Sequence, residues 1–148
     1  MSAHDYPLGR DAVMAHLPHR APMLFIDSVV TSDGRSIHAQ THVDPDWPLF
    51  QGHFPTLPIM PGVLLIEATA QAGALIVSLA GGLQDQSFIA FSGVEQAKFR
   101  KPVRPGDVLD IHAEILRHRS GYYKFAGHVD VNGARVAELR FAATQMPL

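Results

Sequence analysis

An almost uninterrupted apolar segment, residues 62–80, is the strongest feature of the hydrophobicity pattern. It follows Pro61, which suits the first position of a helix, and it precedes Gly81 and Gly82, which suit a helix end. A helix that is apolar on every side must be buried on every side. We therefore expect one central helix that the rest of the chain encloses.

The remaining chain contains short segments with the apolar and polar pattern of strands. We expect a short helix over residues 11–16 and strands over 23–30, 36–43, 88–93, 98–102, 108–119, 122–131 and 134–144. Asn132 and Gly133, between the last two, are typical of a tight hairpin turn. A flat sheet covers only one side of a helix. The pattern therefore predicts an α+β fold, with an antiparallel sheet wrapped around the helix and residues 1–148 as one domain.

The sequence predicts neither a membrane span nor an export signal. The apolar segment contains Glu67, and a carboxylate in mid-bilayer costs at least ~3 kcal/mol. The nearest basic residues, Arg35 and Lys98, are too distant in sequence to anchor a span. Residues 1–10 lack the basic start and apolar run of a signal peptide. We therefore expect a cytoplasmic protein.

A proline-rich segment, residues 44–61, separates two of the predicted strands from the helix. Its five prolines are expected to exclude regular structure, and a long loop inside a domain is usually functional. The loop contains His53 between Gly52 and Phe54. A loop histidine is most often a solvated polar residue, so its neighbours decide what it can do. Directly after the loop, the helix start leaves the N–H groups of Gly62 and Val63 without acceptors.

Glu67 on the second turn of the apolar helix is the other candidate for chemistry. An unpaired carboxylate there would lose several kcal/mol of hydration, so Glu67 must be paired, exposed at a site, or protonated. Gln71 lies one turn further on the same face and can hydrogen-bond to it. Burial raises the pKa of a carboxyl, which would suit Glu67 to act as a general acid near pH 7.

Composition removes several classes of function. The chain has 148 residues, 47% of them hydrophobic, a net charge of -2 and no cysteine. That length supports a real core, and the lack of cysteine excludes disulfides, thiolate zinc sites and cysteine nucleophiles. A near-neutral balance of charge gives no sign of nucleic-acid binding.

The nine histidines raise the question of a metal site. His38, His42 and His53 look like a ligand set, but residues four apart on a strand are separated by ~13 Å. We therefore expect no metal. His16 and His19 are expected to pack or cap around the turn at Pro18.

Four positive charges stand within seven residues, at Lys98, Arg100, Lys101 and Arg104. They are either the solvated charges of an edge strand or a docking surface for an acidic partner.

Several motifs together resemble the FabZ-type 3-hydroxyacyl-[acyl carrier protein] dehydratases. The matching residues are Leu17-Pro18-His19-Arg20, Gly52-His53-Phe54-Pro55, Ile59-Met60-Pro61-Gly62-Val63-Leu64, Glu67-Ala68, Ala70-Gln71, Lys98-Phe99-Arg100, Pro102-Val103 and Pro105-Gly106-Asp107. The resemblance spans residues 17–141 and implies the hotdog fold. It also implies that His53 and Glu67 are the catalytic pair. Glu67, where the related FabA-type enzymes usually have aspartate, favours the FabZ type.

The resemblance implies a hydro-lyase that converts (3R)-3-hydroxyacyl thioesters to trans-2-enoyl thioesters and water. Neutral His53 is the natural base for the C2 proton, since imidazole titrates near pH 6.5, and protonated Glu67 is the natural acid. The reverse assignment is the alternative. Backbone N–H groups of Gly62 and Val63 would stabilise the thioester oxygen. Phe54 and Gln71 complete the expected substrate-binding set.

The resemblance also implies partners. The substrate would be carried by the phosphopantetheine of acyl carrier protein, and Lys98, Arg100, Lys101 and Arg104 would dock the carrier. We expect a homodimer, or a trimer of dimers, in which His53 of one subunit faces Glu67 of the other. No cofactor is expected. The alternatives are a (3R)-enoyl-CoA hydratase, a hotdog thioesterase, or a non-catalytic acyl-binding subunit.

Overall fold

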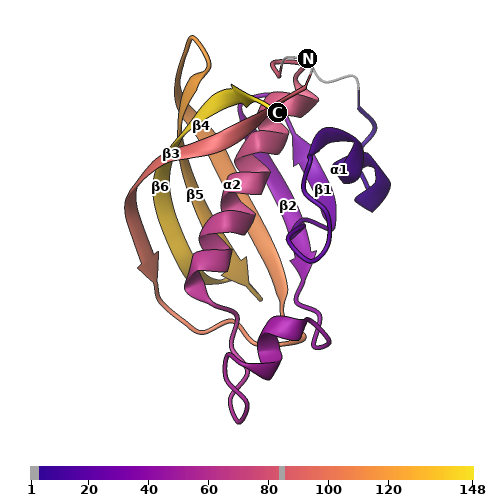
Figure 1. Ribbon diagram of the computed structural model, residues 1–148, viewed down its shortest axis with the longest axis vertical. Coiled ribbons are helices and arrows are strands. Elements are labelled where there is room, and N and C mark those ends of the chain that lie inside the picture. The colour runs from indigo at the N-terminus through magenta and orange to yellow at the C-terminus, as the bar shows by residue number, and fades with distance from the viewer. Residues whose placement is uncertain (1–3, 84–85) are drawn as a thin grey trace.

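In the computed structural model, which describes residues 4–83 and 86–148, a six-stranded antiparallel sheet curves around one long helix (Figure 1). The long helix is α2, Gly62–Leu79, and the short helix α1, Arg10–His16, packs against it. The strand order is β1-β2-β4-β5-β6-β3. Their bounds are β1 Ser28–Ser32, β2 Ser36–His42, β3 Ser87–Phe99, β4 Val108–Arg119, β5 Tyr122–Val131 and β6 Ala134–Pro147. The predicted α+β class, with a sheet wrapped around a helix, is confirmed.

Contacts with β5 set the rotation of α2 about its own axis. A Cβ atom on Gly127 would collide with Thr69, and one on Gly73 would lie 3.1 Å from the Phe125 ring. Helix and strand therefore approach closely because both positions are glycine. Glu67 precedes Thr69 by two residues, which is about 200° around a helix. The same contact therefore turns Glu67 away from the sheet.

Only the C-terminal part of α2 is enclosed. Every residue from Gln71 to Val77 is buried, whereas Glu67 is half-buried and Val63 is 70% exposed. The expectation of burial on every side is wrong for the first turns, because the sheet covers only one side of them. By length and composition α2 could also cross a membrane, but 61% of it is buried inside this fold, which is typical of a core helix.

The ends of α2 differ slightly from the prediction. Pro61 is the residue that caps the helix, so the first helical residue is Gly62 rather than Pro61. The helix ends at Leu79, and Gly81 follows with φ +75°, a conformation that favours glycine.

The structure confirms two predicted strands residue for residue, β4 and β5. Asn132 and Gly133 both have positive φ, as their hairpin turn requires. Two predictions are wrong, and the first concerns the segments 88–93 and 98–102. Residues 88–93 and 98–99 belong to one strand, β3, whereas residues 100–102 lie outside it. β3 has an irregular register between Phe91 and Gly93 and again between Val94 and Gln96.

The predicted strand over residues 23–30 begins only at Ser28. Asp27 N–H still donates to the Gln40 carbonyl of β2, but Met23 and Phe25 bond to side chains instead of to a neighbouring strand. Phe25 N–H donates to Gln71 Oε1 at 2.9 Å, and Thr41 Oγ1 donates to the Phe25 carbonyl. Gln71 Nε2 also donates to the Met23 carbonyl at 2.8 Å. These bonds tie the segment before β1 to α2, one turn beyond Glu67.

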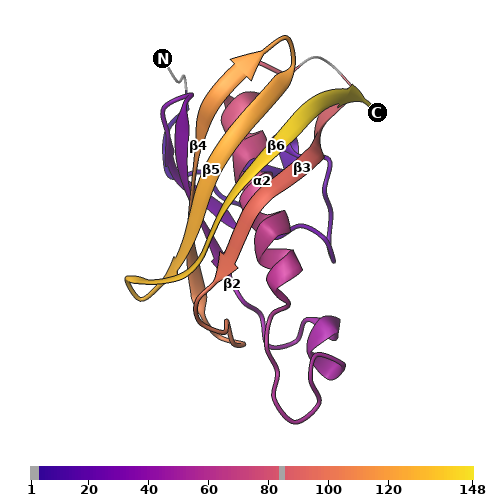
Figure 2. The same cartoon turned by 90° about the vertical axis from the view of Figure 1, so that its left-hand side faces the viewer.

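The proline-rich loop lies at one end of the molecule, beyond the start of α2 (Figure 2). It contains one short 3₁₀ helix, Pro48–Gln51, so the expectation of no regular structure is wrong over four residues. Proline is compatible with the first position of such a turn, which is where Pro48 stands.

Candidate active site

His53 is held in the loop by three hydrogen bonds. Its N–H donates to the Leu49 carbonyl at 3.0 Å, and its carbonyl accepts from Ile59 N–H at 2.9 Å. Its ring Nδ1 lies 2.8 Å from the Ile59 carbonyl oxygen. Phe54 stacks on the ring with centroids 4.1 Å apart. Backbone and side chain are therefore both fixed.

The contact with Ile59 also selects the ring tautomer of His53. A carbonyl oxygen can only accept, so Nδ1 must carry the proton and donate it. In the neutral ring, Nε2 is then the unprotonated nitrogen. This is the arrangement of a histidine that can take a proton from a substrate.

His53 lines an open groove of about 470 Å³ at the start of α2. Gly62, Val63 and Phe99, which is half exposed, also line this groove. A Cβ atom on Gly62 would lie 2.9 Å from the Phe99 ring, so the ring rests directly on the helix start. The sequence placed Phe99 in the Lys98-Phe99-Arg100 motif but gave it no role in the site.

The groove offers hydrogen-bond donors as well as apolar walls. The N–H groups of Gly62 and Val63 belong to the first turn of α2 and have no acceptor among the described residues. No side chain caps this helix start. Free N–H groups and the positive end of the helix dipole together favour a negatively charged oxygen.

Glu67 lies one turn further along α2 than Val63, outside the groove and between two polar side chains. Gln71 Nε2 donates to Glu67 Oε2 at 2.9 Å, which confirms the predicted contact one turn along the helix. His19 Nε2 lies 3.3 Å from the same oxygen. The side chain of Glu67 is 24% exposed. The sequence left three possibilities for Glu67, namely paired, exposed at a site, or protonated. The structure shows a carboxylate that is paired and also partly open to solvent.

The pKa of Glu67 is lowered, not raised, which corrects the prediction from sequence. Burial raises the pKa, but hydrogen bonds from His19 and Gln71, with the charge of His19, outweigh that effect. The sequence predicted the burial of Glu67 because the surrounding helix is apolar. The opposing donor from His19 comes from a segment 48 residues earlier.

His19 is the site residue that sequence reasoning assigned to another role. It does not cap the Pro18 turn, because its ring contacts Glu67. Its Nδ1 is buried without a hydrogen-bond partner in the described part of the chain. A proton on Nδ1 would have nothing to bind, whereas a proton on Nε2 satisfies the carboxylate. His16 also does not cap the turn. Its Nδ1 lies 3.0 Å from Ser78 Oγ, so it contacts α2 instead.

The two candidate catalytic residues do not meet within one chain. No hydrogen bond or ion pair joins His53 to Glu67 over residues 4–83 and 86–148, and Glu67 does not line the His53 groove. His53 and the helix start form the groove, and Glu67, Gln71 and His19 form a second group one turn further along α2. A single subunit therefore presents two half-sites.

The structure divides the four basic residues into two pairs. All four are exposed, but only Arg100 and Lys101 line the groove with His53. Arg100 also pairs with Glu138 on β6. Lys98 and Arg104 lie outside the groove.

Comparison with known proteins gives a consistent family. The family described as FabA-like domain matches residues 17–140. A protein of Colwellia psychrerythraea named 3-hydroxyacyl-[acyl-carrier-protein] dehydratase FabZ is 40% identical over 144 residues, covering 96% of each chain. A protein of Erythrobacter litoralis with the same name is 46% identical over 136 residues, covering 88% of each.

Solved structures share the fold at lower identity. The ApeI:P dehydratase heterocomplex of Xenorhabdus doucetiae superimposes with a TM-score of 0.78 at 23% identity, covering 97% of this chain and 93% of the other. Thioesterase PA1618 of Pseudomonas aeruginosa superimposes with a TM-score of 0.68 at 14% identity, covering 99% and 96%. The shared architecture is the hotdog fold.

Proposed function

We propose, since the chain belongs to the FabA-like family and within it to the FabZ-type 3-hydroxyacyl-[acyl-carrier-protein] dehydratases, that it removes water from a (3R)-3-hydroxyacyl-[acyl carrier protein] in fatty-acid biosynthesis. The product is the trans-2-enoyl thioester. Of the structural observations, the tautomer of His53 supports this function most directly, because it leaves Nε2 free to accept a proton beside the groove.

The chemistry needs a base, an acid and a site for negative charge. His53 Nε2 takes the C2 proton, and the electron pair of that C–H bond forms the new C2–C3 double bond. Protonated Glu67 gives its proton to the C3 hydroxyl, so the C3–O bond breaks with water as the leaving group. Proton exchange with water then restores neutral His53 and protonated Glu67.

The start of α2 is suited to the thioester oxygen. As the C2 proton leaves, charge develops on that oxygen, and the N–H groups of Gly62 and Val63 are free to donate to it. Loss of one such donor typically costs ~3 kcal/mol of transition-state stabilisation. Phe54 and Phe99 would then line the path of the acyl group, and Gln71 would hold Glu67.

The active site is proposed to form between two subunits. His53 and Glu67 belong to separate half-sites in one chain, so a two-fold dimer that brings the His53 loop of one subunit over Glu67 of the other completes two equivalent sites. Exposed apolar side chains beside His53 and its groove, Phe54, Val63 and Phe99, suit such a contact.

Dimerisation also accounts for the acid role of Glu67. In the single chain the pKa of Glu67 is below its usual value, because donors from His19 and Gln71 outweigh burial. A second subunit over Glu67 would increase its burial, and burial is the cause that raises this pKa. The shared site would therefore favour the protonated form that the reaction needs.

Arg100 and Lys101 are the proposed contacts for the carrier. Both stand at the groove beside His53, where the phosphate of a phosphopantetheine arm and the acidic surface of a carrier protein would approach. Lys98 and Arg104 would act only through the wider positive field. The reaction takes place in the cytoplasm in this proposal.

The test is turnover of purified protein on 3-hydroxyacyl thioesters of graded chain length, carried on acyl carrier protein and on CoA. Formation of the enoyl thioester, followed by its ultraviolet absorbance, is the expected result, with carrier-bound substrate preferred. Release of free thiol without enoyl product would instead identify a thioesterase. Absence of turnover at every length would indicate an acyl-binding protein without catalysis, and preference for CoA would indicate an enoyl-CoA hydratase.

A further inference from the structure

The outer face of the sheet, which faces away from α2, carries a row of three histidines. His38 on β2, His112 on β4 and His128 on β5 are direct cross-strand neighbours. Their rings stack with centroid distances of 4.3 Å and 4.7 Å. The proposed dehydration uses none of them, since His53 and Glu67 are presented at α2 and its preceding loop.

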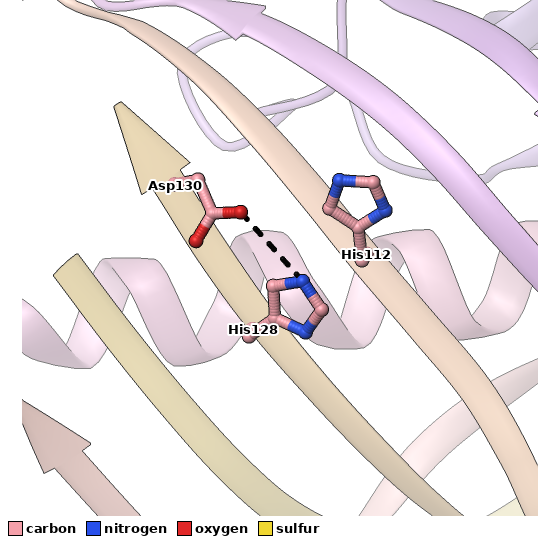
Figure 3. A group of neighbouring side chains, drawn as sticks. All are labelled: His112, His128 and Asp130. Atoms are coloured by element: carbon pink, nitrogen blue, oxygen red, sulfur yellow. Dashed lines mark ion pairs between the residues drawn. The ribbon is translucent and has the colours of Figure 1, made fainter. Parts of the chain in front are cut away.

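Asp130 joins two of these rings to form a compact cluster. It follows His128 by two residues on β5, so both side chains project from the same face (Figure 3). His112 projects beside them from β4 (Figure 3). One ligand atom from each of the three side chains lies within 4.8 Å of the other two. His128 Nε2 and Asp130 Oδ2 are 3.7 Å apart.

The neighbours of the cluster leave these ligand atoms available. His38 Nε2 is already bound to Asp110 Oδ1 at 2.7 Å, which removes it from the set. Arg135 Nε donates to Asp130 Oδ1 at 2.9 Å and leaves Oδ2 toward His128. Neither His112 nor His128 makes a hydrogen bond to the described part of the chain.

The surroundings of both histidines favour the neutral imidazole. Burial, followed by the charges of His38 and His128, lowers the pKa of His112. Burial, followed by the charge of Arg135, lowers the pKa of His128. A metal ligand must be the neutral imidazole, which has a lone pair to donate.

We propose that His112, His128 and Asp130 form a binding site for a borderline divalent transition-metal ion such as Zn²⁺. Two imidazole nitrogens and one carboxylate oxygen are a common ligand set for such ions, with water in the remaining position. Zinc bonds of ~2.1 Å require the ligand atoms to approach within ~3.4 Å of one another, which side-chain rotation on two adjacent strands can provide.

The site would act on the stability of the sheet and not on the reaction. It links β4 to β5 on the face opposite α2, whereas the proposed chemistry lies at the start of α2 and at Glu67. An ion that binds only the folded chain raises its melting temperature by mass action. Turnover at a temperature well below melting should therefore be the same with and without the ion.

Titration of the full-length protein with ZnCl₂ by isothermal calorimetry, after treatment with a chelator, tests the proposal. We expect one site per chain. His112→Ala and His128→Ala should each raise the Kd for Zn²⁺ by at least ~10-fold. His42→Ala is the matched control, because it removes an exposed histidine of β2 outside the cluster. Binding that survives both cluster variants, or that is lost equally in His42→Ala, would overturn the proposal.

Arg135→Gln separates a ligand site from a merely structural cluster. The guanidinium shares Asp130 and its positive charge opposes a cation, so its removal should tighten Zn²⁺ binding several-fold. Damage to the strand pair would weaken binding instead. Unchanged or weaker affinity in this variant, with a native circular dichroism spectrum, would contradict a role for Asp130 as a ligand.

Discussion

The carboxyl of Glu67 is the residue-level basis of the proposed mechanism, because it supplies the proton that turns hydroxide into water. Glu67→Gln keeps the shape of the side chain and loses the transferable proton. We expect dehydration to fall by at least ~100-fold, measured as enoyl product under saturating substrate, while circular dichroism and the elution volume stay unchanged. Turnover near that of the wild type would remove Glu67 from the mechanism.

His19 is expected to be a positioning residue that acts through Glu67. In His19→Ala, a donor that lowers the pKa of Glu67 is lost while burial remains, so this pKa should rise. The ¹³C shift of labelled glutamate carboxyl carbons against pH measures it, with the signal assigned by its loss in Glu67→Gln. Turnover should fall ~10-fold because the carboxyl is less well oriented.

His19→Gln is the conservative control, since an amide N–H can replace the imidazole donor. It should restore most of the rate and most of the lowered pKa. If His19→Ala leaves the titration of Glu67 where it was, the proposed positioning role is incorrect.

Contacts between residues close in sequence could be predicted before the structure was known, whereas contacts between residues distant in sequence could not. The contact between Glu67 and Gln71 follows from helical spacing alone. His19 lies 48 residues from Glu67, so no local pattern connects them, although its Pro-His-Arg motif already carried the family resemblance. The wrong prediction for the pKa of Glu67 has the same origin, because it included burial and omitted the distant donor.

At the scale of elements, the segment after β3 is expected to dock the carrier through Arg100 and Lys101. Replacing both with glutamate should raise KM for carrier-bound substrate by ~10-fold or more and leave kcat/KM for a CoA or N-acetylcysteamine analogue nearly unchanged. Lys98→Glu with Arg104→Glu is the matched control outside the groove and should have a smaller effect. Equal loss on both substrates would show that the segment supports the fold instead.

The packing of α1 on α2 should make stability depend on pH. Burial, followed by the charge of His4, lowers the pKa of His16, whose Nδ1 lies 3.0 Å from Ser78 Oγ. The unfolded chain therefore binds a proton at higher pH than the folded chain. The contribution of His16 is present above pH ~6.5 and is lost as the pH falls below that value.

Urea unfolding at several pH values between 8 and 5 measures this effect. The free energy of unfolding should fall less steeply with acid in His16→Gln than in the wild type. Identical slopes in both proteins would exclude His16 as a source of the dependence.

Strands with a clean alternation were predicted well, and segments with other bonding partners were not. β4 and β5 pair on both sides and have the predicted bounds, with one irregular register in β4 between Ile115 and Arg117 and one in β5 between Val129 and Asp130. Residues 23–27 have a strand-like sequence, but Met23 and Phe25 bond to the side chains of Gln71 and Thr41, which no alternation can reveal. The irregular register of β3 against β6 made one strand look like two.

At the scale of the molecule, the main result is that one chain holds the proposed catalytic pair in two separate groups of residues. The hotdog fold explains this, because the sheet turns Glu67 outward on α2 while the loop that holds His53 lies beyond the helix start (Figure 2). The sequence predicted both residues and the wrapped helix. The partly open face of α2 became visible only in the structure.

Complementation between two inactive variants tests the shared site most directly. His53→Ala and Glu67→Gln subunits, each nearly inactive alone, are co-refolded or co-expressed, and enoyl product is measured. A mixed dimer contains one intact site and one that lacks both groups. With random exchange half of the dimers are mixed, so about a quarter of all sites should regain activity. Activity that stays at the level of the single variants, although mass spectrometry shows mixed dimers, would contradict the shared site.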